Sequence, residues 1–116
     1  MLSFSMVPAV SAGSDMYGLI GKMIAIPGKR DELIKLLLAG SGDMPGCLSY
    51  VVAKDLSNEN AIWITEVWAD KASHQDSLQL PAVREAISKA RPLIAGFDTS
   101  HTTEPVGGLG LKVPKR

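Results

Sequence analysis

The sequence predicts an α+β domain of the ferredoxin-like type, with a βαββαβ order of elements and a four-stranded antiparallel sheet that carries its helices on one face. Three observations lead to this prediction. Four segments are rich in β-forming residues that alternate with a period of two. The stretches that precede the second and the fourth of these β-forming segments carry apolar residues at helical spacing. Gly, Pro and Asn residues mark the turns between these segments.

The first strand and the first helix are expected at residues 17–26 and 29–39. Residues 17–26 place mainly apolar side chains on both sides of the alternation, and a Pro-Gly pair closes them. Residues 29–39 combine charged residues with leucines at three- and four-residue spacing, as in an amphipathic helix. Gly40 and Gly42 are suited to end this helix.

A strand hairpin is expected next. Residues 47–56 and 61–68 carry the β-forming residues, and the polar run 57–60 between them is typical of a turn. Both faces of the second strand are largely apolar, so we expect neither face to be open to water. One face carries Ile62, Ile64, Glu66 and Trp68, and the other carries Trp63, Thr65 and Val67.

A second helical region is expected to begin at Asp70, a residue type that caps helix N-termini. It is interrupted at Pro81, which then opens a further helix at its first turn. We expect this helix to run as far as Gly96, and residues 97–106 to form the last strand. Its apolar residues fall along one stripe: Val83, Ile87, Ala90 and Ile94.

The face of the sheet without helices is predicted to be an interface. Handedness rules put both helices on the same face. The opposite face would then expose apolar side chains, whose burial is favourable by about 25 cal/mol per Å². A homodimer is the simplest way to remove them from water. The residues concerned are Ile24, Val51, Trp63 and Val67.

The composition predicts one domain and argues against several functions. Of 116 residues 46% are hydrophobic, yet no apolar run is long enough to span a membrane. The 12 basic and 12 acidic residues cancel, so no nucleic-acid partner is expected. We assign residues 1–15 to a flexible N-terminal arm, 16–106 to the domain and 107–116 to a C-terminal tail. Cys47 is the single cysteine, which fits a reducing compartment and a cytoplasmic location.

The hairpin also carries two recognisable motifs. They read PGCLSY at residues 45–50 and EVWADKAS at residues 66–73. Both resemble patterns of the antibiotic biosynthesis monooxygenase superfamily, and the resemblance extends over most of the chain. It implies a dimeric α/β barrel similar to quinol monooxygenases, which would oxidise a small aromatic diol or quinol with O2. No cofactor and no metal would be required.

The chain departs from this family at several positions. Many members carry one histidine where Ser77 stands and another where Ala82 stands. Relatives that degrade haem carry an Asn near Gly21 and a His near Ile87, together with a Trp at the position of Trp68. Of these three residues the chain has the tryptophan, so haem degradation is not expected.

Four residues are expected to carry the chemistry. The indole N–H of Trp68 would orient a substrate oxygen, and Glu66, on the same face of its strand, would be a desolvated base. His74 and His101 are further candidate proton acceptors near neutral pH. Each also has a structural interpretation. Trp68 would be a core residue, Glu66 would cap a helix or form an ion pair, and the two histidines would lie at the surface.

The substrate is expected to contact a second set of mostly apolar residues. These candidates are Tyr17, Tyr50, Ile64, Val83 and Ile87. Two alternatives to the oxygenase remain open. One is an isomerase or proton-transfer enzyme acting on a small phosphorylated signal sugar, and the other is a dimer that binds a small ligand without catalysis.

Overall fold

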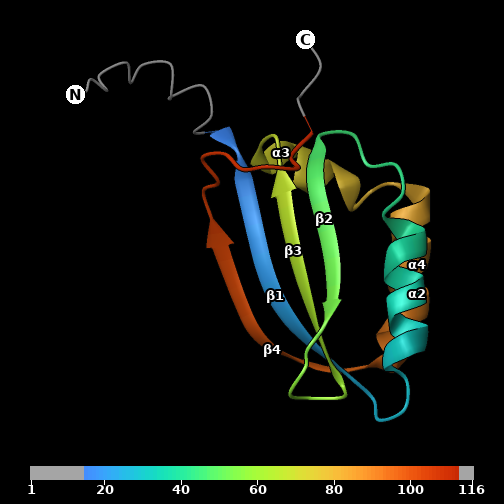
Figure 1. Cartoon of the computed structure of the whole chain (residues 1–116). Coiled ribbons are helices and arrows are strands. Elements are labelled where there is room, and N and C mark those ends of the chain that lie inside the picture. The colour runs from blue at the N-terminus through green and yellow to red at the C-terminus, as the bar shows by residue number, and fades with distance from the viewer. Residues whose placement is uncertain (1–14, 113–116) are drawn as a thin grey trace.

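The computed structural model describes residues 15–112, which form one four-stranded antiparallel sheet with helices on one side (Figure 1). The strand order in the sheet is β2-β3-β1-β4. This confirms the predicted ferredoxin-like α+β fold. The elements, with the labels of Figure 1, are β1 Tyr17–Ala25, α2 Arg30–Gly40, β2 Cys47–Lys54, β3 Ala61–Trp68, α3 Lys71–Ser77, α4 Pro81–Ala90, the 3-10 helix η3 Arg91–Leu93 and β4 Ile94–Thr103.

The hydrophobic core lies between the sheet and helices α2 and α4, which pack on the same face (Figure 1). Leu33 of α2 and Ile62 of β3 are completely buried there. Their positions follow from the two periodicities, since Leu33 belongs to the leucine stripe of α2 and Ile62 to the apolar face of β3. Each fully buried side chain of this size stabilises the fold by about 1.5–3 kcal/mol.

The turn between β2 and β3 is organised by Asp55. Its Oδ1 accepts hydrogen bonds from the backbone N–H groups of Ser57 and Asn58, and its Oδ2 accepts one from Trp63 Nε1 at 2.7 Å. The hydrogen bond from Trp63 is the main reason why the pKa of Asp55 is lowered. Because Asp55 already turns the chain, β2 ends at Lys54 and not at Leu56 as the sequence had suggested.

The start of α3 matches the sequence prediction. Asp70 is the N-cap, and its Oδ1 accepts a hydrogen bond of 2.8 Å from the backbone N–H of Ser73. The hydrogen bonds from Ser73 lower the pKa of the Asp70 carboxyl, so the contribution of this cap to stability is fully present above the ordinary pKa of aspartate and is lost as the pH falls through the lowered pKa of the folded state.

The end of α4 and the start of β4 differ from the sequence prediction. The predicted helix to Gly96 and the predicted strand from residue 97 were wrong, because α4 ends at Ala90 and β4 already begins at Ile94. Pro92 explains the difference. It has no N–H with which to continue the α-helical hydrogen bonds, so α4 ends and the chain tightens into η3. Ile94 therefore belongs to the sheet.

The face of the sheet opposite the helices is partly apolar. Val51 is 53% exposed there, and Val67 and Trp63 are half-buried. A charged group interrupts this surface, since Lys22 Nζ lies 5.5 Å from the ring centroid of Trp63 and 3.4 Å from a carboxylate oxygen of Asp98.

The chain after β4 crosses one end of the sheet (Figure 1). A side chain at Gly18 of β1 would meet Pro105, and the N–H of Lys112 donates a hydrogen bond of 3.0 Å to the carbonyl of Leu48 in β2. This part of the predicted tail therefore lies against the chain's own sheet. Apart from Asp15, the predicted N-terminal arm lies outside the described residues, as do residues 113–116.

Candidate functional site

A cavity of about 680 Å³ lies between the helix-covered face of the sheet and helices α2, α3 and α4. Its volume is within the range of about 300–1,000 Å³ that is usual for small-molecule sites. Most of its wall is apolar, because α4 and the first residues of β4 turn apolar side chains toward it, Val83, Ile87, Ile94 and Phe97 among them. The side chains with polar or charged groups in the wall are Ser41, Tyr50, Glu66, Trp68, His74, Ser77 and Arg91.

Glu66 and Trp68 form the polar centre of this wall. The period of a strand puts both residues on the same face of β3, and Trp68 Nε1 donates a hydrogen bond of 2.9 Å to Glu66 Oε1. Trp68 is 1% exposed, so this hydrogen bond is shielded from water. Burial raises the pKa of Glu66, and the hydrogen bond from Trp68 and the positive charge of His74 offset part of that rise.

His74 lies next to this pair, on the short helix α3. Its ring meets Trp68 edge-on, with centroids 5.3 Å apart, and is stacked at a tilt against Tyr17 with centroids 5.6 Å apart. Ser77 Oγ donates a hydrogen bond of 2.6 Å to the carbonyl of His74, one turn earlier. A buried serine that bonds the backbone thus occupies one position at which many relatives are expected to carry a histidine.

Tyr50 contributes a phenol to the cavity from β2. It is paired with Glu66 across the two strands, so both side chains stand on the same face of the sheet. Burial, followed by the negative charge of Glu66, strongly raises the pKa of Tyr50. Its hydroxyl therefore keeps its proton over the physiological pH range and can donate a hydrogen bond to a bound molecule.

The structure brings together six of the nine residues that the sequence had singled out. Trp68, Glu66, His74, Tyr50, Val83 and Ile87 all line the cavity.

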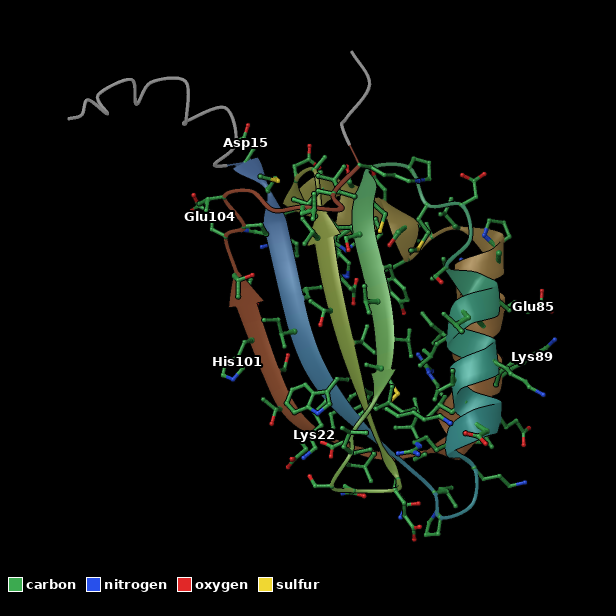
Figure 2. All side chains as sticks on the ribbon, in the orientation of Figure 1. Asp15, Lys22, Glu85, Lys89, His101 and Glu104 are labelled. Atoms are coloured by element: carbon green, nitrogen blue, oxygen red, sulfur yellow. The ribbon has the colours of Figure 1, made fainter. Side chains whose placement is uncertain are left out.

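The other three candidates lie elsewhere. Tyr17 stands behind His74, and Ile64 is a buried core residue beside the cavity. His101 is exposed on the edge strand β4, paired with Ile20 of β1 and directed away from the helices (Figure 2). The structure therefore separates His101 from the other candidate residues.

Several lining residues had no signal in the sequence that was specific enough to find them. Met44 and Leu78 come from loops and Phe97 from the edge strand β4, and all three reach the cavity through tertiary packing. Arg91 did have a signal, since it follows Val83 and Ile87 at four-residue intervals.

Other reactive groups of the described residues add little to this site. Within residues 15–112 no three side chains of His, Cys, Asp or Glu lie close enough together to hold one metal ion. Burial raises the pKa of the Cys47 thiol, whose Sγ lies 3.5 Å from the carbonyl oxygen of Ser49. In the same part of the chain we find no helix with the length and apolar character needed to cross a bilayer.

Comparison with known proteins finds relatives of this domain. The sequence pattern of the family named antibiotic biosynthesis monooxygenase matches residues 16–89. A crystal structure from Chloroflexus aurantiacus, of a protein that carries the same family name, is 60% identical in sequence and superposes with a TM-score of 0.82. The match covers 83% of this chain and 98% of the Chloroflexus chain.

Two more distant relatives extend the comparison. A structure from Caulobacter crescentus under the same family name is 20% identical, covers 84% of this chain and 95% of its own, and has a TM-score of 0.73. At that identity the likeness shows the fold alone. An uncharacterized Synechocystis protein, sll1783, is 28% identical over 102 residues, which is 80% of this chain and 69% of the Synechocystis protein.

Proposed function

Since this chain belongs to the antibiotic biosynthesis monooxygenase family, we propose that it is a cofactor-independent monooxygenase that oxidises a small aromatic diol or quinol with O2. One observation carries the proposal above the others. In a cavity with a mostly apolar wall, a partly buried carboxylate with a raised pKa is held by the N–H of a buried tryptophan. A base in a dry pocket is what the deprotonation of a phenol requires.

The reaction balances without an external reductant. Removal of a phenolic proton gives an electron-rich anion that passes an electron to O2. The resulting superoxide and ring radical combine, so that one oxygen atom forms a bond to a ring carbon. Loss of water, which takes the second oxygen atom and two substrate hydrogens, leaves a hydroxyquinone. The ring loses four electrons and the two oxygen atoms gain them.

Each polar residue has a role in this proposal. Trp68 occupies one carboxylate oxygen of Glu66, so the other oxygen accepts the substrate proton. Tyr50 keeps its proton and donates a hydrogen bond to the developing oxyanion. His74, half-buried beside Trp68, passes the proton from Glu66 to water.

The test is oxygen consumption by the purified, chelator-treated protein over a panel of hydroquinones and dihydroxynaphthalenes. We expect one O2 to be consumed for each substrate, and one atom of labelled O2 to appear in the product. Uptake that does not exceed the uncatalysed rate for any diol would reject the oxygenase. In that case, ligand binding without turnover would favour a binding protein, and deuterium exchange without oxygen uptake would favour an isomerase.

We further propose that the protein acts as a homodimer, paired through the sheet face opposite the helices. Its support is the exposure of apolar side chains on that face, with Val51 and Val67 at its centre. A charge placed there is expected to separate the subunits. Val51→Lys should shift the mass from dimer toward monomer in light scattering at micromolar concentration, whereas Leu56→Lys, in the exposed β2–β3 turn, should leave it unchanged. A monomeric wild-type protein would reject this proposal.

A further inference from the structure

One wall of the cavity is a single stripe of side chains along helix α4, and it ends in a positive charge at the first residue after this helix. The stripe follows the spacing of one helix face and is about 12 Å long, at 1.5 Å per residue. Four of its members are apolar and the last is a guanidinium. In chain order they are Val83, Ala86, Ile87, Ala90 and Arg91.

The backbone of Arg91 is held in place at this end of the cavity. Its N–H donates to the carbonyl of Ile87 as the helix cap, and Pro92 fixes the turn that follows. Two residues further on, the carbonyl of Leu93 accepts a hydrogen bond of 2.9 Å from the N–H of Ile26, directly after β1. The origin of the Arg91 side chain is therefore fixed relative to the sheet.

The guanidinium of Arg91 has no partner of opposite charge in residues 15–112, where no carboxylate lies within ion-pair distance of it. Lys89, two residues earlier, makes a 2.9 Å ion pair with Glu85 on the outer side of the same helix (Figure 2). Arg91 is also the one Lys or Arg among the described residues that line the cavity. A positive charge at the end of an apolar wall is available to a bound anion.

Arg91 and Glu66 lie toward opposite ends of the cavity. Glu66 is paired with Leu19 near the start of β1, whereas Ile94, just after η3, is paired with Ala25 at the end of β1. The same arrangement is visible in Figure 1, where α3 lies at one end of the sheet and α4 leads to the start of β4 at the other. A molecule that reaches both groups must be elongated.

We infer that the cavity binds an elongated aromatic acid, with a phenolic hydroxyl at Glu66 and a carboxylate at Arg91. The inference rests on the proposed function, which supplies the phenol at Glu66. A single aromatic ring would leave most of the 680 Å³ empty, and it is too short for the stretch of β1 from Leu19 to Ala25 that separates the two ends. Arginine suits the distal group because its planar guanidinium binds a carboxylate through two parallel hydrogen bonds. Arg91 is then a specificity-determining residue.

The test compares an acid with its uncharged amide. The probes are hydroxybiphenyl carboxylic acid, with its two groups at opposite ends of the rings, and the corresponding carboxamide. Their dissociation constants are measured by calorimetry with the full chain. We expect the wild type to bind the acid about tenfold more tightly than the amide, which is in the range of hydrogen bonds to charged groups. Arg91→Gln should lose this preference while its affinity for the amide is unchanged.

Arg84→Gln is the matched control, because Arg84 is exposed, as Arg91 is, and lies on α4 but does not line the cavity. It should keep the tenfold preference, and Arg91→Lys should keep part of it. Equal binding of acid and amide by the wild type, no binding of either, or a preference that survives in Arg91→Gln would overturn the inference.

Failure of this inference and failure of the proposed function give different results. Oxygen uptake with an uncharged dihydroxynaphthalene, without any preference for the acid probe, keeps the oxygenase and rejects the role of Arg91. A preference for the acid that Arg91→Gln abolishes, without oxygen uptake on any diol, keeps the acid site and rejects the oxygenase.

Discussion

Replacing Glu66 with Gln is expected to lower kcat for oxygen uptake by about 10²–10⁴-fold, the usual contribution of a general base. The amide of the new side chain keeps an oxygen that can accept the Trp68 N–H, so the wall of the cavity should keep its shape. The amide is not basic enough to take a phenolic proton. Steady-state oxygen consumption measures the effect, and a Kd for the amide probe that stays within a few-fold of wild type shows that the cavity is intact.

Although Glu66→Gln lowers kcat, it is not expected to lower the stability of the fold. Burial raises the pKa of Glu66 above its usual value, so the folded state favours the protonated form. The contribution of this group to stability is then present at low pH and is lost as the pH rises through the folded-state pKa. At neutral pH, Glu66→Gln should therefore leave the free energy of unfolding in urea equal to wild type or above it.

Glu104→Gln serves as the control, since Glu104 is an exposed carboxylate after β4 and away from the cavity. It should change neither kcat nor stability. A Glu66→Gln protein that unfolds more easily than wild type and has normal kcat would show that Glu66 is a structural residue. In the wild type, kcat should rise with pH as Glu66 loses its proton, with a midpoint above the ordinary glutamate pKa.

The part of the site that lies on one strand was predictable from the sequence. Glu66 and Trp68 share a face of β3 because the strand period is two, and no tertiary information is needed to see it. The same reasoning put Ile62 on that face, and it is completely buried there. Asp70 was predicted as the cap of α3 because its carboxylate bonds a backbone N–H three residues later, which is also a local interaction.

The rest of the site depends on how helices and strands are placed relative to one another, which the sequence does not show directly. His74 and His101 were equivalent as lone histidines, yet α3 carries the first against Trp68 and the edge strand carries the second to the opposite face. Arg91 was missed because the helix was extended past Pro92, so the residue seemed to lie inside the helix and not at its end. Proline chemistry outweighed the apolar periodicity there.

Replacing Gly46 with Ala is expected to lower the free energy of unfolding by about 2–5 kcal/mol and to disturb the site. Gly46 precedes β2 with a φ of 83°, in the left-handed region, where a side chain costs about 1–2 kcal/mol. A Cβ at this position would also lie 2.5 Å from the Cβ of Ser73, a contact that must push α3 away and adds about 1–3 kcal/mol. Urea unfolding measures the loss.

Gly28→Ala separates the two contributions. Gly28 has the same φ of 83°, but nothing lies within 4 Å of the position that its Cβ would take. Gly28→Ala should therefore lower the free energy of unfolding only by the backbone contribution, about 1–2 kcal/mol, and should keep normal kcat. Gly46→Ala should lower kcat as well, because α3 carries His74 and the carbonyl of Gly46 accepts a hydrogen bond of 2.8 Å from Ala69 just before that helix. Equal losses in the two variants would mean that α3 yields to the new methyl group without cost, and that the close approach of Gly46 does not position His74.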